Sequence, residues 1–363
     1  MDDGGPQRGP RTSSSFYRTP APPNLSDFRG GLTAPIIRPR VIRDWIIFAL
    51  VLLASGLLAA GTMILLLART LLRPTRMTDG RATWLLKRLS PGDLKLNFED
   101  LQFQVRDEQT GRPLDITAWW IPSAGVTSTR TILLIHGYAD AKVGAIAWAP
   151  TLHALGWNIL AIDLRAHGYS DGTLSTAGFW ERHDVTQVIN QFRAMRPRET
   201  ETFAMFGISL GAAVAVATAA MRDDINGVIL ESPFADYRPA VAAHGRMRGL
   251  PGGWMRDTAI RLAEWQSGAD FRAVRPRDLI PKLTCPVMIV HAGADPFIPP
   301  DDAAAMAESM KTRGDARDVL WSVPEAGHVL GLAAVGPDEY RMRVAGFLDA
   351  VADRQAVTSS RGH

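Results

Sequence analysis

Apolar residues are distributed along this chain in three different ways, and each predicts a different kind of structure. Residues 1–40 are rich in Pro, Gly, Ser and Arg and show no periodic apolar positions. Such a composition cannot bury a core, so we predict a disordered tail there. An uncharged run follows, from Trp45 to Leu67. From about Leu94 onwards, short apolar runs alternate with longer helix-like stretches, and we predict one globular domain over residues 94–354.

The uncharged run is long enough to cross a membrane. At a rise of 1.5 Å per residue, a helix of about 23 residues is about 35 Å long, which exceeds a hydrocarbon thickness of about 30 Å. A cleaved signal peptide fits poorly, because the run is too long and begins far from the N-terminus. We therefore predict one transmembrane helix over residues 45–68. Arginines flank it almost equally on both sides, so the positive-inside rule does not decide on which side of the membrane the globular domain lies.

Eight short runs in the globular part predict β-strands. They cover residues 101–105, 114–121, 131–135, 158–163, 203–206, 227–231, 287–291 and 319–323. The last five or six are almost wholly apolar, as expected for strands buried on both faces of a parallel sheet. A turn-like segment, residues 109–113, separates the first two strands and predicts an antiparallel hairpin at one edge.

Helix-like stretches lie between these strands, at residues 145–155, 181–195, 210–221 and 301–311. Strands that alternate with helices predict an α/β fold with a mostly parallel, doubly wound sheet. The connection at residues 235–284 is too long for an ordinary loop, and we predict a small helical cap there. We expect a shortened chain that starts near Met77 to be soluble and active, because the domain has its own sheet and core.

Composition narrows the classes of function. The chain has a formal net charge of +3, and its Lys and Arg residues form no block interleaved with aromatic residues. We therefore expect no nucleic-acid partner. The single cysteine, Cys285, precedes an apolar run and excludes an intramolecular disulfide framework and a multi-cysteine zinc site. We interpret it as buried packing, and we expect neither a metal nor an organic cofactor.

The sharpest chemical signal is the segment GISLG at residues 207–211, which fits the pattern G-x-S-x-G. An apolar strand-like run precedes it and a helical stretch of small residues follows it. This is the strand–turn–helix context of a nucleophile elbow, in which a strained turn exposes the serine hydroxyl. The N-terminus of the following helix adds positive potential. We therefore predict that Ser209 is a nucleophile.

A serine hydroxyl is a weak nucleophile and needs a base that a third group holds in place. His328 follows the last predicted strand, and Asp295 follows the penultimate one. The order Ser…Asp…His is that of hydrolases with such an elbow. We predict His328 as the general base and Asp295 as the acid that orients it. Glu231 and Asp236 also lie near the end of a core strand and are alternatives for the acid.

An oxyanion needs two preorganised N–H donors. The amide of Leu210, directly after the nucleophile, is one predicted donor. The amide of Tyr138, in the segment HGY after the third predicted strand, is the other. The Tyr138 hydroxyl either assists or lines the pocket. We interpret His136 as a structural residue that holds this loop.

Six segments make the chain similar to the α/β-hydrolase family over about Leu94 to Arg354. They are HGY (136–138), DLRAHGYSDG (163–172), GISLGAA (207–213), ESPFAD (231–236), GADPFIP (293–299) and AGH (326–328). In particular, they resemble membrane-anchored hydrolases of the BEM46 and ABHD13/ABHD17 type, and peptidase S9-like hydrolases. The resemblance implies a site made of Ser209, Asp295, His328 and the amides of Tyr138 and Leu210. It implies a structural role for Asp163, Arg165, His167 and Gly168.

The sequence therefore predicts a serine hydrolase that cleaves an ester, thioester or amide bond through an acyl-enzyme intermediate. Its expected substrate is a small-molecule or lipid-like acyl compound. The family includes lipases, thioesterases, acyltransferases and peptidases, so the resemblance implies the reaction type rather than the substrate. The alternative is a non-catalytic binding or scaffold protein that retains the fold.

Overall fold

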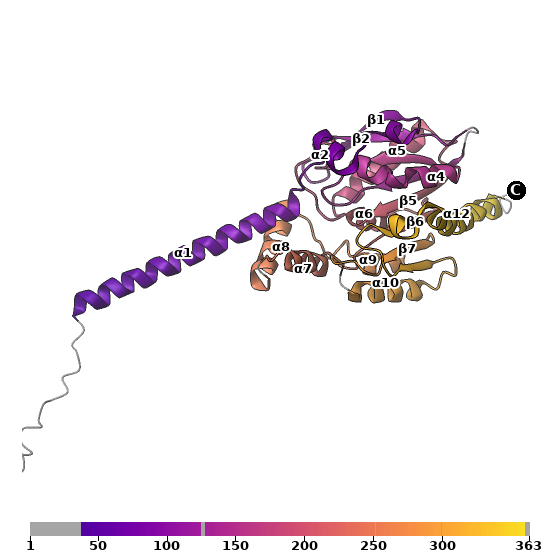
Figure 1. Ribbon diagram of the computed structural model, residues 1–363. Helices are drawn as coiled ribbons and strands as arrows, with labels where there is room; N and C mark the ends of the chain where they lie inside the picture. The colour runs from indigo at the N-terminus through magenta and orange to yellow at the C-terminus, as the bar shows by residue number, and fades with distance from the viewer. Residues whose placement is uncertain (1–37, 125–127, 251, 299, 360–363) are drawn as a thin grey trace, which may run out of the picture. The chain divides into compact units, whose positions relative to one another are not determined.

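The computed structural model describes residues 38–124, 128–250, 252–298 and 300–359 (Figure 1). The predicted tail, residues 1–40, lies almost wholly outside the described residues. The chain divides into two compact units, Met1–Leu57 and Leu58–His363. The second unit therefore begins well before residue 94, where we placed the start of the catalytic domain.

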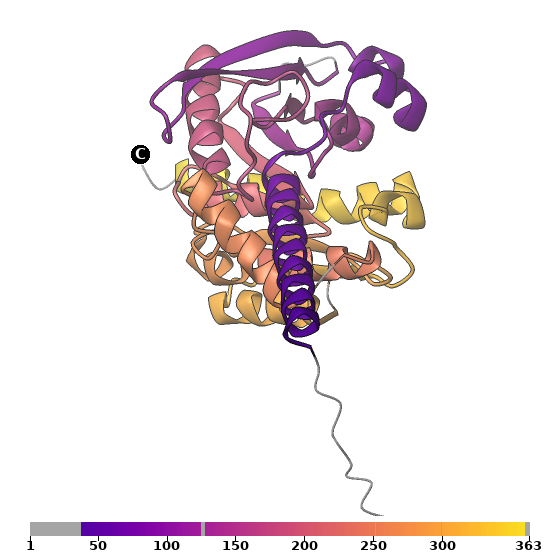
Figure 2. The same ribbon diagram turned by 90° about the vertical axis from the view of Figure 1, so that its left-hand side faces the viewer.

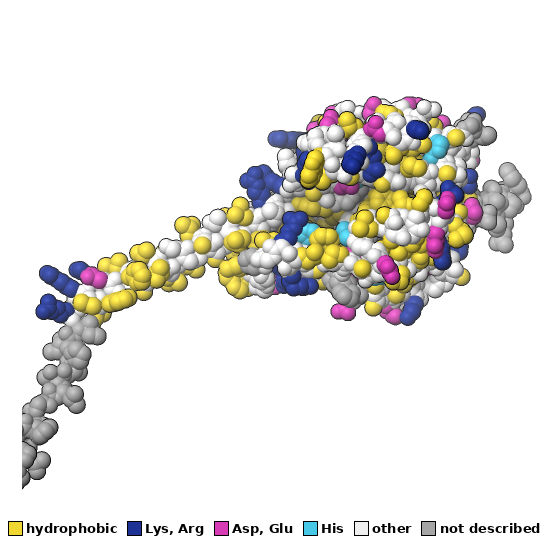
Figure 3. Space-filling model, viewed as in Figure 1, with side chains coloured by type: hydrophobic (Ala, Val, Ile, Leu, Met, Phe, Trp, Pro, Cys, Tyr) yellow, Lys and Arg dark blue, Asp and Glu magenta, His cyan; other side chains and the backbone are white. Residues whose placement is uncertain are grey.

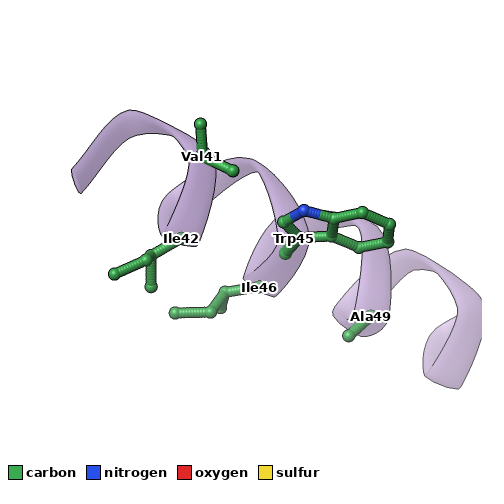
Figure 4. A pocket seen from close by; sticks show the side chains of 5 residues that line it. All are labelled: Val41, Ile42, Trp45, Ile46 and Ala49. Atoms are coloured by element: carbon green, nitrogen blue, oxygen red, sulfur yellow. The ribbon is translucent and has the colours of Figure 1, made fainter. Parts of the chain in front are cut away.

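The long apolar run forms helix α1, Pro39–Leu72, which has 34 residues. Figure 4 shows five apolar side chains of its first turns, those of Val41, Ile42, Trp45, Ile46 and Ala49. Most large apolar residues between Val41 and Leu58 are exposed, and none of the most hydrophobic stretch is buried. A helix of this length that is apolar all round is a candidate membrane span.

We expect the full chain to stay in the pellet when membranes are extracted with alkaline carbonate or high salt. These treatments remove proteins that are held on the surface but leave a spanning helix in place. Sedimentation followed by immunoblotting measures the partition. As a control, a chain carrying both Leu53→Arg and Leu57→Arg should be released, because each charge near the helix centre costs about 2.5–3.5 kcal/mol. Release of the unaltered chain by carbonate would contradict the span.

The second unit is built around an eight-stranded sheet in the order β1-β2-β4-β3-β5-β6-β7-β8. The strands are β1 (Glu99–Arg106), β2 (Pro113–Ile121), β3 (Arg130–Ile135), β4 (Asn158–Ile162), β5 (Thr202–Ile208), β6 (Gly227–Glu231), β7 (Val287–Ala292) and β8 (Val319–Val323). β1 pairs antiparallel with β2, and β2 with β4; the other neighbours are parallel. The mostly parallel sheet and the hairpin at one edge are both confirmed.

Helices cover both faces of the sheet (Figures 1 and 2). They are α2 (Asp79–Leu86), α3 (Lys142–Ala145), α4 (Ala149–Ala154), α5 (Glu181–Met195), α6 (Leu210–Ala219), α10 (Pro300–Arg313), α11 (Gly331–Val335) and α12 (Pro337–Ser359), with short 3-10 turns η2 (Pro91–Leu94) and η3 (Ile146–Trp148). Along β3, Leu133 belongs to one apolar cluster with α5 and α6, whereas Leu134 belongs to another with α4 and α12. Successive side chains of a strand point to opposite faces, so a wholly apolar strand fills both layers.

Strand β8 departs from the predicted burial. Its apolar sequence predicts a strand buried on both faces, but Val319 and Leu320 are exposed while Trp321 and Val323 are buried. β8 is the last strand of the sheet and pairs with β7 on one side. An edge strand that helices cover on one face keeps its other face in water, so the prediction of full burial is wrong here.

The segment predicted as a cap, residues 235–284, is helical. It contains α7 (Tyr237–Met247), α8 (Trp254–Ser267), α9 (Pro276–Leu279) and the 3-10 turn η4 (Ile280–Lys282). The buried face of α8, which includes Ile260 and Ala263, lies in a third apolar cluster together with Phe271 and Leu210. Because Leu210 is the first residue of α6, this segment packs next to the turn that carries Ser209.

The end of α1 belongs to the same third cluster. Its members there are the buried residues Ala68 and Leu72 and the partly buried Ile64, Leu67 and Leu71. They recur every three or four positions and so form one face of the helix. A chain that starts at Met77 would lack all of them and would expose their apolar partners. The expectation that such a shortened chain retains an intact domain is therefore not supported.

Candidate active site

Ser209 lies in the turn between β5 and α6, with φ of 52° and ψ of −110°. Residues other than glycine rarely adopt a positive φ, and such strain persists only where the surroundings hold it. Both flanking glycines are needed because the backbone is crowded. A Cβ at Gly207 would lie 2.3 Å from the Gly211 carbonyl oxygen, and one at Gly211 would lie 2.3 Å from that of Ile135. The segment GISLG thus forms the tight elbow that its sequence predicts.

The three side chains predicted as a triad lie in one hydrogen-bonded line. Nε2 of His328 is 2.9 Å from Oγ of Ser209, and Nδ1 of His328 is 2.6 Å from Oδ2 of Asp295. The other carboxylate oxygen of Asp295 accepts the backbone N–H groups of Phe297 and Ile298, at 2.8 and 3.1 Å. The Asp295 side chain is 3% exposed, so its charge is held by fixed donors rather than by water. With Nδ1 donating to the carboxylate, Nε2 is free to accept the serine proton.

An aromatic pair that the sequence did not single out covers the histidine. The ring of Phe297 packs edge-on against His328 with centroids 5.2 Å apart, and His244 of α7 stacks on Phe297 at 4.7 Å. Burial, helped by the nearby charge of Arg248, lowers the pKa of His244. In the sequence, only the position of Phe297, two residues after Asp295, could have indicated that it lies near the site. Nothing in the sequence indicates this for His244, because its contact with Phe297 depends on how α7 packs.

The two alternative acids, Glu231 and Asp236, form hydrogen bonds with other residues. Glu231 is fully buried at the end of β6 and accepts the hydroxyl of Tyr340 at 2.7 Å and the amide of Gly331 at 3.1 Å. Burial raises the pKa of Glu231 to about 7. Asp236 caps α7 by accepting the amide of Arg238 at 3.0 Å. Among the described residues, neither carboxylate is a hydrogen-bond partner of His328.

The two predicted oxyanion donors flank the elbow. Leu210 begins α6, so its amide has no acceptor within its own helix. The loop of Tyr138 reaches the nucleophile closely, since a Cβ at Gly137 would lie 3.5 Å from Cβ of Ser209. The Tyr138 hydroxyl is engaged elsewhere, because it donates to the carbonyl of Thr70 in α1. The Tyr138 and Leu210 amides therefore remain the predicted donors.

His136 holds this loop, as its sequence position predicts. Its Nδ1 donates to the carbonyl of Gly137 at 2.7 Å, and its Nε2 accepts the amide of Leu164 at 3.0 Å. Burial lowers the pKa of His136 to about 3, so the ring stays neutral. A neutral, fully bonded histidine of this kind is structural.

The loop at residues 163–172 is also structural. Asp163 pairs with Lys142 at 2.5 Å, and Arg165 pairs with Asp184 at 2.5 Å in the interior. Nδ1 of His167 bonds the Arg165 carbonyl at 2.9 Å. Gly168 has φ of +45°, and a Cβ there would lie 2.3 Å from the Asp163 carboxylate. The sequence did not reveal a further support: Arg76, just after α1, donates to the carbonyls of Gly168, Ser170 and Gly172.

Solved structures with a similar fold include hydrolases. An esterase of Pyrococcus furiosus matches with a TM-score of 0.62 and 21% identity, over 77% of this chain and 98% of that one. The α/β hydrolase GrgF of Penicillium matches with a TM-score of 0.54 and 18% identity, over 70% and 99% of the two chains. The chain has the α/β-hydrolase fold.

Comparisons of the sequence also find hydrolases. A family model described as serine aminopeptidase, S33, matches residues 127–267, which include Ser209 but end before Asp295. The chain is 27% identical to YqkD of Bacillus subtilis over 227 residues, which are 62% of this chain and 72% of that one. It is 30% identical over 190 residues to lysophosphatidylserine lipase ABHD12 of Macaca fascicularis, which are 50% of this chain and 45% of that one. Together, these relatives support hydrolase activity.

Proposed function

We propose that this protein is a serine hydrolase that cleaves an acyl ester through an acyl-enzyme intermediate; thioesters and amides are the other bond types open to this chemistry. Ser209 is the nucleophile, His328 the general base and Asp295 the acid that orients it. The observation that carries the proposal is the continuous hydrogen-bonded line from Asp295 through His328 to Ser209, which is raised on a strained turn. The esterase and lipase among the similar proteins favour esters as substrates.

In the first half of the reaction, Oγ of Ser209 attacks the carbonyl carbon while Nε2 of His328 takes the hydroxyl proton. The carbonyl π electrons move to oxygen, and the amides of Tyr138 and Leu210 bind the resulting oxyanion. Asp295 stabilises the imidazolium, and its two backbone donors hold the carboxylate in place. Collapse of the tetrahedral intermediate expels the alcohol, which leaves with the proton from His328.

The second half repeats these steps with water. Nε2 of His328 takes a proton from water, and the oxygen of water attacks the acyl-Ser209 carbonyl. The same two amides bind the second oxyanion. Collapse then breaks the bond to Oγ, which regains its proton from His328, and the free acid departs. The protein returns to its starting state, so the cycle needs no external oxidant or reductant.

Labelling with a fluorophosphonate probe tests the proposal, because only an activated serine attacks its phosphorus. We expect the native chain to be labelled and a heat-denatured chain to remain unlabelled. A series of p-nitrophenyl esters from acetate to palmitate, with a thioester and an aminoacyl amide alongside, then measures which acyl bond is cleaved fastest. A folded chain that neither reacts with the probe nor turns over any of these compounds would be the non-catalytic scaffold instead.

A further inference from the structure

The end of α1 connects to both residues predicted to bind the oxyanion. Leu210 is 4% exposed and shares its apolar cluster with Ala68 and Leu72 of α1. On the other side of the elbow, the hydroxyl of Tyr138 donates to the carbonyl of Thr70. The last turns of α1 are therefore part of the wall around the candidate nucleophile.

This contact fixes the height of the site above a membrane. Thr70 lies three residues after Leu67, where the uncharged run ends. At 1.5 Å per residue, this separation is about 4.5 Å along the helix axis. If α1 spans a bilayer, Tyr138 lies at the level of the lipid headgroups, whichever side of the membrane the domain occupies.

The segment next to α1 carries the residues that suit such a position. Trp254 and Trp265 of α8 are 62% and 80% exposed, and they lie eleven residues, or about three turns, apart on one face. Met247, the last residue of α7, and Leu250, between α7 and α8, are exposed as well. Tryptophan is enriched at membrane–water interfaces, because its ring is apolar and its N–H is polar.

Figures 1 and 2 show α8 beside the last turns of α1. Figure 3 shows apolar and basic side chains together around a hollow in this part of the second unit, with histidine side chains at its border. An exposed apolar surface with a polar border is typical of a lipid-binding or protein-binding site. Its continuity with α1 favours lipid.

We propose that the active site opens at the membrane surface and that the acyl chain of the substrate reaches Ser209 along the end of α1, directly from the bilayer. The substrate is then a long-chain acyl ester of a membrane lipid, and α1 is a part of the binding site as well as an anchor. This inference rests on the proposed function of Ser209.

The physical advantage of this path is large. Each additional methylene group in the acyl chain lowers the fraction of the substrate that is dissolved in water about fourfold, because the group is transferred from hydrocarbon to water. A site that lies within a few ångströms of the lipid avoids this loss, since the chain moves from one apolar surface to another. A site held farther away would meet only the small fraction of substrate that is dissolved in water.

The test changes the height of the site without touching its packing. Seven polar helix-forming residues are inserted between Met63 and Ile64. The insertion keeps Ile64–Leu72 against the domain and leaves residues 45–63 to span the membrane. It raises the site by about 10.5 Å and nearly preserves the helical phase. The matched control has seven Leu and Ala residues at the same place, so its apolar run still ends at Leu67.

Two esters are assayed with each protein reconstituted in dioleoylphosphatidylcholine vesicles. They are p-nitrophenyl butyrate, which is soluble in water, and p-nitrophenyl palmitate, which is dissolved in the bilayer. We expect turnover of butyrate to stay within about twofold in both insertion variants. Turnover of palmitate should fall at least about tenfold with the polar insertion and stay within about threefold with the apolar one, since only the polar insertion separates the site from the lipid.

A second variant leaves α1 unchanged. The double substitution Trp254→Gln and Trp265→Gln alters exposed side chains only, and it should lower palmitate turnover severalfold with butyrate turnover intact. The proposal is overturned if, in both the polar-insertion and the double-tryptophan variant, the turnover of palmitate changes by the same factor as the turnover of butyrate. If the unaltered chain neither reacts with the fluorophosphonate probe nor turns over any of the acyl substrates, the proposed function is overturned and, with it, the inference.

Discussion

Replacing Ser209 with alanine should abolish labelling by the fluorophosphonate probe and lower ester turnover by a factor of about 10³ or more, as for other triad members. The substitution removes only Oγ, whose hydrogen bond is to His328. Alanine also adopts the positive φ of the elbow no worse than serine does, so the fold and its thermal stability should be unchanged. The measurement is the initial rate with p-nitrophenyl butyrate, together with in-gel fluorescence of the probe.

Ser322 provides the matched control for this substitution. It is an exposed residue of the edge strand β8 and lies outside the candidate site, so Ser322→Ala should keep turnover within about twofold. Probe labelling that persists in Ser209→Ala would show that another nucleophile reacts and would remove Ser209 from the proposed mechanism.

The features that the sequence predicted well are those that neighbouring residues determine. All eight strands were predicted because each is a short apolar or β-branched run between turn residues. The helix over Glu181–Met195 was predicted to the residue by its periodic apolar positions. The elbow was predictable because its strain is local: the backbone crowding at Gly207 and Gly211 comes from within the β3–β5–α6 unit.

The features that the sequence did not predict depend on contacts between distant segments. Nothing in the sequence near Thr70 indicates that its carbonyl accepts a hydrogen bond from Tyr138. The apolar residues at the end of α1 are equally compatible with contact with lipid. Their burial depends on partners such as Phe271, some two hundred residues away. Likewise, the apolar sequence of β8 does not reveal that this strand is at the edge. The apolar pattern of a sequence indicates which residues are shielded from water. Whether lipid or another part of the protein shields them depends on the tertiary structure.

Replacing Asp295 with asparagine should lower turnover at least about a hundredfold and up to about 10⁴-fold, with little change in thermal stability. The reason lies in the two backbone amides, of Phe297 and Ile298, that donate to one oxygen of this side chain. The amide oxygen of asparagine must take that place, which turns its NH₂ group toward Nδ1 of His328. Nδ1 is then an acceptor, so Nε2 carries the ring proton and cannot take the proton of Ser209. The rate with p-nitrophenyl butyrate measures this loss.

The two alternative acids, Glu231 and Asp236, provide the controls for this prediction, because each can also be changed from a carboxylate to its amide. Glu231→Gln keeps an oxygen that accepts from Tyr340 or Gly331, and Asp236→Asn keeps a good N-cap for α7. The turnover of both variants should therefore stay within about tenfold of that of the unaltered chain. The opposite pattern, in which Asp295→Asn remains active while Glu231→Gln or Asp236→Asn is inactive in a folded protein, would assign the role of the acid to Glu231 or Asp236 instead. An acceptor that bonds Nδ1 holds the ring in the tautomer that Ser209 needs, and of these three carboxylates Asp295 is the one that lies within hydrogen-bond distance of Nδ1, at 2.6 Å.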